Sequence, residues 1–193
     1  KSQFIGDISC WNVSNVEDMS HMFENSAFNN DLSRWDVSNV KKMSHIFAIS
    51  PFNGDISNWN VSNVTDMSYM FHYTPFDGNI SNWDVSNVQN LFYLFYECES
   101  LQNVNGLINW NVSNVLDMFA SFAFCSSLAN IDGIKNWNTS SVTDMANLFT
   151  NCYSLNNFSA IANWNTSSVG TTYGMFANSS DYNPGYLDAT PLA

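Results

Sequence analysis

The chain has 193 residues, of which 45% are hydrophobic and 16% aromatic, so it can bury a sizeable core and is too apolar to be disordered. Its 5 lysines and arginines stand against 17 aspartates and glutamates, a formal net charge of -12 that excludes nucleic acid and anionic membrane surfaces as partners. No run of about 18 apolar residues could span a membrane. Residues 1–4 lack the features of a signal peptide and the chain starts inside a repeat, so any export signal or anchor is expected outside this sequence.

A repeat runs through the chain and is marked by its tryptophans. The first four are 24 residues apart and the last three follow at a spacing of 27: Trp11, Trp35, Trp59, Trp83, Trp110, Trp137 and Trp164. A phenylalanine follows each of them by twelve residues: Phe23, Phe47, Phe71, Phe95, Phe122, Phe149 and Phe176. The spacing predicts one domain over residues 1–193, with 24-residue coils to about residue 97 and 27-residue coils to about residue 176. Residues 177–193 are expected to close the last coil, with a turn at 181–185.

Each repeat has two halves with different patterns. Spaced apolar residues over 4–11 and 28–35 are typical of a strand that packs on one side. After it, Asn15 can cap a helix whose apolar face, Met19 to Phe23, has the spacing i, i+3, i+4. The fold class predicted is an α/β repeat, a leucine-rich-repeat-like solenoid with a parallel sheet on one face and short helices on the other.

The strings WNVSNVEDMSHMF and WNVSNVTDMSYMF resemble the BspA-like leucine-rich-repeat surface proteins and the similar mycoplasma lipoprotein-type repeats. The resemblance covers roughly residues 4 to 176. It implies an extracellular or cell-surface protein that acts in adhesion or recognition, with no catalytic residues to carry over.

No catalytic arrangement, phosphate-binding loop or zinc-binding cysteine pattern is present, so neither an enzyme nor a cofactor is predicted. His21 and His45 stand at the same position of successive repeats, which we call a column, and they could reach one metal ion. No third ligand is evident, so no metal site is predicted. Asp7, Asp31 and Asp55 share another column, where stacked carboxylates repel unless a cation or donor intervenes. One interpretation is that calcium ions bind between these carboxylates. The preferred interpretation is an acidic face screened by solvent, or carboxylates that accept hydrogen bonds from loop amides.

Two further sets of residues, the cysteines and the glycosylation sequons, bear on the cellular compartment of the protein. Cys98, Cys125 and Cys152 share a column, and three thiols in one ladder cannot all pair, so unpaired core thiols are expected. Nine Asn-x-Ser/Thr sequons follow from the repeat and are glycan candidates only in a eukaryotic source or a virus of eukaryotes. They are Asn12, Asn60, Asn63, Asn79, Asn111, Asn138, Asn157, Asn165 and Asn178. Otherwise they serve turns.

Aromatic residues replace serine and histidine in two columns of the helical half over two or three coils. Tyr69, Phe92, Tyr93 and Phe119, with Tyr96 at the edge, are predicted to form a partly exposed patch that contacts a partner. Lateral packing between thicker coils is the alternative interpretation. The function predicted is a surface-exposed binding or adhesion module for a protein or glycan, extracellular or on a cell surface. The rival hypothesis is a structural building block of a filament, appendage or virus particle.

Overall fold

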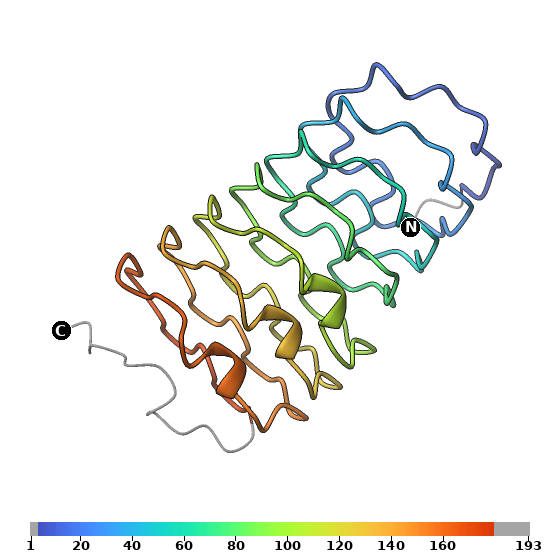
Figure 1. The fold of residues 1–193 in the computed structure, drawn as a ribbon. Coiled ribbons are helices and arrows are strands. Elements are labelled where there is room, and N and C mark those ends of the chain that lie inside the picture. Colours follow the sequence, from blue (N-terminus) through green and yellow to red (C-terminus); the bar gives the residue numbers. More distant parts are fainter. Residues whose placement is uncertain (1–3, 180–193) are drawn as a thin grey trace.

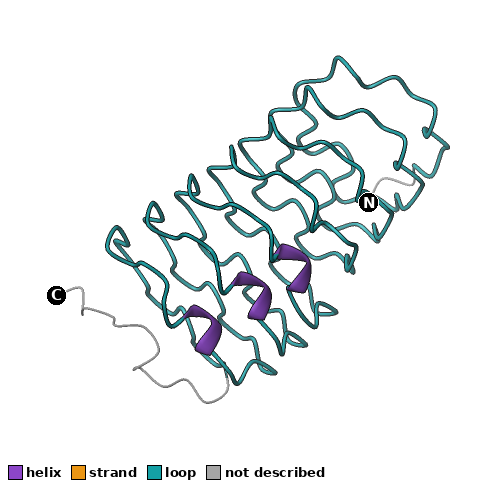
Figure 2. Ribbon diagram, in the orientation of Figure 1, coloured by secondary structure: helices purple, strands orange, loops and turns teal. Residues whose placement is uncertain are grey.

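Successive repeats lie side by side as a column of irregular, turn-built coils in a computed structural model that describes residues 4–179 (Figure 1). The predicted closing turn at 181–185 lies outside these residues. Within residues 4–179 the regular elements are three 3₁₀ helices, η1 (Asn105–Leu107), η2 (Asp132–Ile134) and η3 (Ser159–Ile161). They occupy the same place in three neighbouring coils (Figure 2).

The predicted α/β solenoid, with a parallel sheet and short helices, is wrong. Residues 4–179 contain no strand and no α-helix. Parallel pairing between coils is confined to isolated bridges, such as Asp18 with Lys42 and Lys42 with Asp66. The segments 4–11 and 28–35, predicted as strands, consist of turns and irregular backbone.

The predicted helix is replaced by consecutive turns because two residues in each coil have left-handed backbone. One lies ten residues after the tryptophan and the other fourteen, as in His21 (φ 62) and Asn25 (φ 49). A residue with positive φ ends a right-handed helix. The amides that a helix would use internally therefore donate to the next coil instead, for example Met19 N to Lys42 O at 3.0 Å and His21 N to Ser44 O at 2.9 Å.

Side chains complete the turns. Asp18 Oδ1 accepts from the amide of Ser20 at 2.9 Å, and Asp66 Oδ1 accepts from Ser68 at the same distance. These are Asx turns, in which a side-chain oxygen takes the place of a backbone carbonyl. Asn63 holds in its repeat the place of Asn15, the predicted helix cap, but it donates through Nδ2 to Ser38 O of the preceding coil at 2.7 Å. The polar residues of the repeat thus hold turns and join coils.

The core consists of stacked aromatic columns. The Phe47 ring stacks at 3.8 Å on Phe52, five residues later in the chain, and at 6.1 Å on Phe71, the equivalent residue of the next coil. Tryptophans from the second coil onward are buried and donate to the preceding coil, as Trp59 Nε1 does to Leu32 O at 3.1 Å. The phenylalanines that follow each tryptophan by twelve residues are all buried, and Phe71 is 0% exposed.

The longer coils differ from the shorter ones at the 3₁₀ helices. The 24-residue coils carry a second phenylalanine column, Phe28, Phe52 and Phe76, at this place. The 27-residue coils replace it with Leu101, Leu128 and Leu155, followed by η1, η2 and η3, whose leucine or isoleucine points into the core. None of the helices in residues 4–179 is long and apolar enough to cross a bilayer.

Candidate binding surface

The aromatic residues singled out in the sequence come together on the structure. Tyr69, Phe92, Tyr93, Tyr96 and Phe119 are all half-buried, and we call them the aromatic patch. Ring centroids are 4.7 Å apart for Tyr69 and Tyr93, 5.2 Å for Phe92 and Phe119, and 4.4 Å for Tyr93 and Tyr96. The patch therefore combines packing between coils with an accessible edge, so both interpretations of these columns describe part of its geometry.

Two of the five rings stand on residues with left-handed backbone. Tyr69 and Tyr93 both have φ 56, and the amide of each donates to the coil that follows. At the Phe92 position of earlier coils, the amides of Ser20 and Ser68 donate to the side-chain oxygen of the residue two positions before, and Phe92 N does the same to Asn90 Oδ1 at 2.9 Å. The local backbone at this column therefore does not depend on the aromatic side chain.

Burial also sets the protonation of the patch. It raises the pKa of Tyr69, Tyr93 and Tyr96 above the usual tyrosine value. These phenols stay protonated across the physiological range and can donate hydrogen bonds to a partner.

A histidine column continues the patch toward the N-terminus. The His21 ring stacks on His45 at 4.5 Å, and His45 stacks on Tyr69 at 4.1 Å. His21 Nδ1 lies 2.8 Å from Glu24 Oε2. Burial is the main cause that lowers the pKa of His45, so this imidazole is neutral at pH 7.

Glu24 and His72 also lie at this surface, although nothing in the sequence singled them out. They share a column, thirteen residues after a tryptophan, with buried Ala48 between them in the same column. Burial is the main cause that lowers the pKa of His72; His45 lowers it further, and Glu24 acts in the opposite direction. The column itself was visible in the sequence, but its position beside the histidines follows only from the left-handed backbone.

The aspartates considered as a cation ladder serve their own turns. Asp7, Asp31 and Asp55 are exposed, and each accepts from the amide of the serine two residues later, at 2.8 to 2.9 Å. That hydrogen bond is the largest of the causes that lower the pKa of each carboxyl. Turn amides therefore supply the donors that this column needs.

Seven of the nine sequon asparagines accept from the amide of the serine two residues later, and Asn63 and Asn178 bond to neighbouring coils instead; all nine are exposed. Asn60 Oδ1 accepts from the amide of Ser62 at 3.2 Å and from its hydroxyl at 2.8 Å, and Asn12 does the same with Ser14. Asn178 Nδ2 donates to Asn151 Oδ1 at 2.7 Å.

The expected unpaired core thiols are confirmed. Cys98, Cys125 and Cys152 are free and buried, while Cys10 is free and exposed. Each buried Sγ donates to a phenylalanine carbonyl of the preceding coil, Cys98 to Phe71 O at 2.9 Å. Burial raises the pKa of Cys98 and Cys152 to about 12 and that of Cys125 well above its usual value. These cysteines are inert hydrogen-bond donors.

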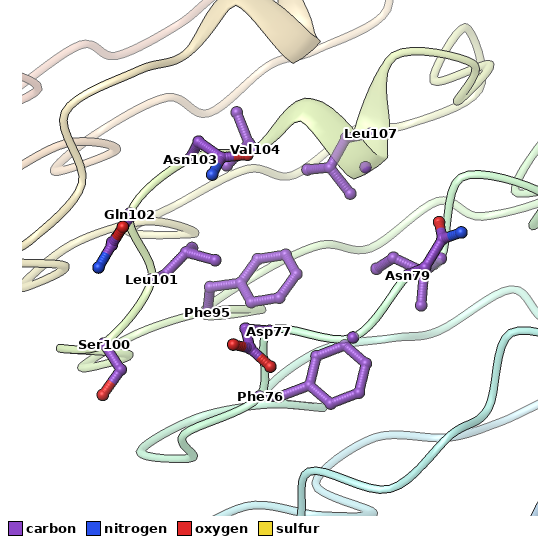
Figure 3. A pocket seen from close by; sticks show the side chains of 13 residues that line it. Phe76, Asp77, Asn79, Phe95, Ser100, Leu101, Gln102, Asn103, Val104 and Leu107 are labelled. Atoms are coloured by element: carbon purple, nitrogen blue, oxygen red, sulfur yellow. The ribbon is translucent and has the colours of Figure 1, made fainter.

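A cavity of about 400 Å³ opens where coil length changes from 24 to 27 residues (Figure 3). Phe76, Phe95 and Leu101 form its apolar floor, and Asp77 and Gln102 are among the polar residues around them. It arises because the longer coil carries η1 and the coil before it has no counterpart.

These features define the class of the protein, a repeat protein built from turns that carries aromatic and histidine residues on one surface. The family model described as "Mycoplasma protein of unknown function, DUF285" matches residues 1–49, 48–129 and 102–187. The chain belongs to this family. No curated protein and no solved structure matches the chain.

Proposed function

We propose that the chain is a non-enzymatic binding module, exposed on a cell surface, that recognises a protein through the aromatic patch. The observation that carries the proposal is the gathering of five half-buried rings on one site, in a repeat whose core is already filled by other columns. Aromatic residues are frequent anchors of protein interfaces because they bury much area at little entropic cost. The resemblance to BspA-like surface repeats supports the location.

The stacking of the rings favours a protein over a glycan. Tyr69 is covered on one face by His45 at an interplanar angle of 18° and on the other by Tyr93 at 7°. Phe92 and Phe119 likewise stack on each other. A sugar ring packs on an open aromatic face, whereas these rings offer edges and hydroxyl groups. A protein surface with apolar side chains and carbonyl acceptors complements such edges.

The test is the double substitution Phe92→Ser with Phe119→Ser, which introduces the residue of the first three coils at this column. Binding of the labelled protein to target cells should fall at least tenfold, equivalent to about 1.4 kcal/mol. Loss of the ring contacts should lower stability by only about 1 kcal/mol, because the turn amides keep their acceptors. Circular dichroism and thermal melting would show that the variant is folded.

Tyr173→Ser is the matched control. Tyr173 occupies the same column in a later coil, is 81% exposed and lies outside the patch, so its removal should leave binding unchanged. Binding that survives the double substitution contradicts the proposed site. Protease treatment of the target cells should abolish binding, and loss after glycosidase treatment alone would instead identify a glycan partner.

Light scattering separates the proposal from the rival structural role. A binding module is monomeric or a small oligomer in solution, whereas a building block forms an ordered assembly that the double substitution disrupts.

A further inference from the structure

Three potential metal ligands from two neighbouring coils converge beside the aromatic patch. One ligand atom each from His21, Glu24 and His45 lies within 4.8 Å of the other two. His21 and Glu24 belong to the first coil, and His45 stacks on His21 from the second. This is the third ligand that the sequence did not reveal.

We propose that His21, His45 and Glu24 bind a zinc-like transition metal ion. Two imidazoles and a carboxylate form a donor set that suits Zn²⁺ and its neighbours, whereas Mg²⁺ and Ca²⁺ prefer sites made of oxygen alone. Three protein ligands leave a fourth position for water.

Small side-chain movements bring the ligands to bonding distance. Bond lengths of about 2.1 Å place tetrahedral ligands about 3.4 Å apart, so separations that all lie within 4.8 Å have to close by about 1.4 Å at most. The two imidazoles are stacked with an interplanar angle of 22°, so each ring has to turn for its lone pair to face the ion. The side chains of His21 and Glu24 are 56% and 34% exposed and are free to do so.

His45 carries an unsatisfied ligand atom. Its Nδ1 is buried and has no hydrogen-bond partner, an arrangement that costs free energy until a donor or a metal ion supplies one. A rotation of the ring toward His21 and Glu24 would satisfy this nitrogen.

The surrounding charge is also favourable. The carboxylates of Glu24 and Asp66 both act on His45, and Asp18 interacts electrostatically with His21. The formal net charge of the whole chain is -12. A divalent cation would therefore enter a negative field.

The experiment is a titration of the 193-residue chain with ZnCl₂ by calorimetry, in a Cys10→Ser background that removes the exposed thiol. One ion per chain should bind at micromolar concentration, and the melting temperature should rise with Zn²⁺ but not with Mg²⁺. His21→Tyr, His45→Tyr and Glu24→Gln should each weaken binding at least tenfold, since loss of even a supporting group does so. Tyrosine occupies the same column at Tyr69 and Tyr93, so these variants keep the ring stack and the fold.

His72→Gln is the matched control, because it removes a nearby imidazole outside the proposed ligand set. Unchanged Zn²⁺ affinity in this variant supports the assignment. The proposal is overturned if the parent protein gives no Zn²⁺ signal, if His45→Tyr binds as tightly as the parent, or if His72→Gln loses as much affinity as the ligand variants. Co²⁺ substitution adds a second readout, because its visible absorption reports tetrahedral coordination independently of heat.

Discussion

Left-handed backbone at residues other than glycine recurs in every coil. Tyr73, Glu97 and Phe124 hold one of the two positions with φ between 53 and 62, and Ile49 holds it with a β-branched side chain at φ 56. Each such residue costs on the order of 1 kcal/mol, and asparagine tolerates the conformation better than most. The inter-coil hydrogen bonds that this geometry permits offset the cost.

Tyr73→Asn should therefore raise stability by about 0.5–1 kcal/mol. Tyr73 has φ 53 and is 52% exposed, so little buried area is lost, and Asn25 and Asn151 already occupy its column. Chemical denaturation measures the change. Tyr173→Asn is the control, because Tyr173 is an exposed tyrosine whose backbone is not left-handed. This exchange should give no gain in stability. Equal effects at both positions would mean that the left-handed backbone of Tyr73 does not cost stability.

Which residues are buried could be predicted from the sequence. Ile56, Val64 and Phe71 recur at fixed places in the repeat, and each is at most 1% exposed. Recurrence predicts burial because a repeat stacks equivalent side chains on one another, whatever the local backbone. Trp11 departs from its column with 55% exposure, because no preceding coil covers it among residues 4–179.

Secondary structure could not be predicted in the same way. Met19, Met22 and Phe23 have helical spacing, but two consecutive turns place apolar residues at the same intervals. The sequence did carry a signal of turns, since Asp18 and Ser20 have the spacing of an Asx turn. No single residue type predicts the left-handed positions, because histidine, tyrosine, alanine and asparagine all occur there.

The 3₁₀ helices provide a test at the scale of the element. A Cβ atom on Gly133 in η2 would lie 1.9 Å from Val104 O of the preceding coil, so Gly133→Ala should cost about 1–3 kcal/mol. Gly106 holds the equivalent place in η1, and the nearest atom to its Cβ would be Ile80 N at 4.0 Å. Gly106→Ala should be neutral or slightly stabilising. Thermal melting compares the two variants, and equal losses would mean that η1 and η2 pack differently from the structure described.

Across the whole molecule, backbone hydrogen bonds between coils join each coil to its immediate neighbours. Lys42 pairs with Asp18 before it and with Asp66 after it, and the same pattern recurs along the column. Stability in such an array is approximately a sum over coils and their interfaces.

Deletion of residues 59–82, one whole repeat, should consequently leave a folded and shorter protein. The join places Trp83 three residues after Ile56, the spacing that every other coil uses. Circular dichroism and a single melting transition at lower temperature are expected. Deletion of residues 59–70 is the control, because half a repeat misaligns every later column and should unfold the C-terminal part. Similar melting of both deletions would argue against nearest-neighbour coupling.

The candidate surface was predictable only in part. The change from serine to aromatic residues at Phe92 and Phe119 was visible along the sequence and placed these rings together. The convergence of Glu24 with His21 and His45 was not visible, since it depends on the left-handed turn between the columns.

The buried cysteine column reports how often neighbouring coils separate. Cys98, Cys125 and Cys152 donate hydrogen bonds to three successive coils, and their high pKa keeps them unreactive while those coils stay closed. A thiol reagent should therefore label Cys10 at once and the other three only at the rate at which coils separate. Mass spectrometry of the labelled peptides over time would then record the order in which the coils around Cys98, Cys125 and Cys152 open. Rapid labelling of all four cysteines would show that the column opens far more readily than its packing implies.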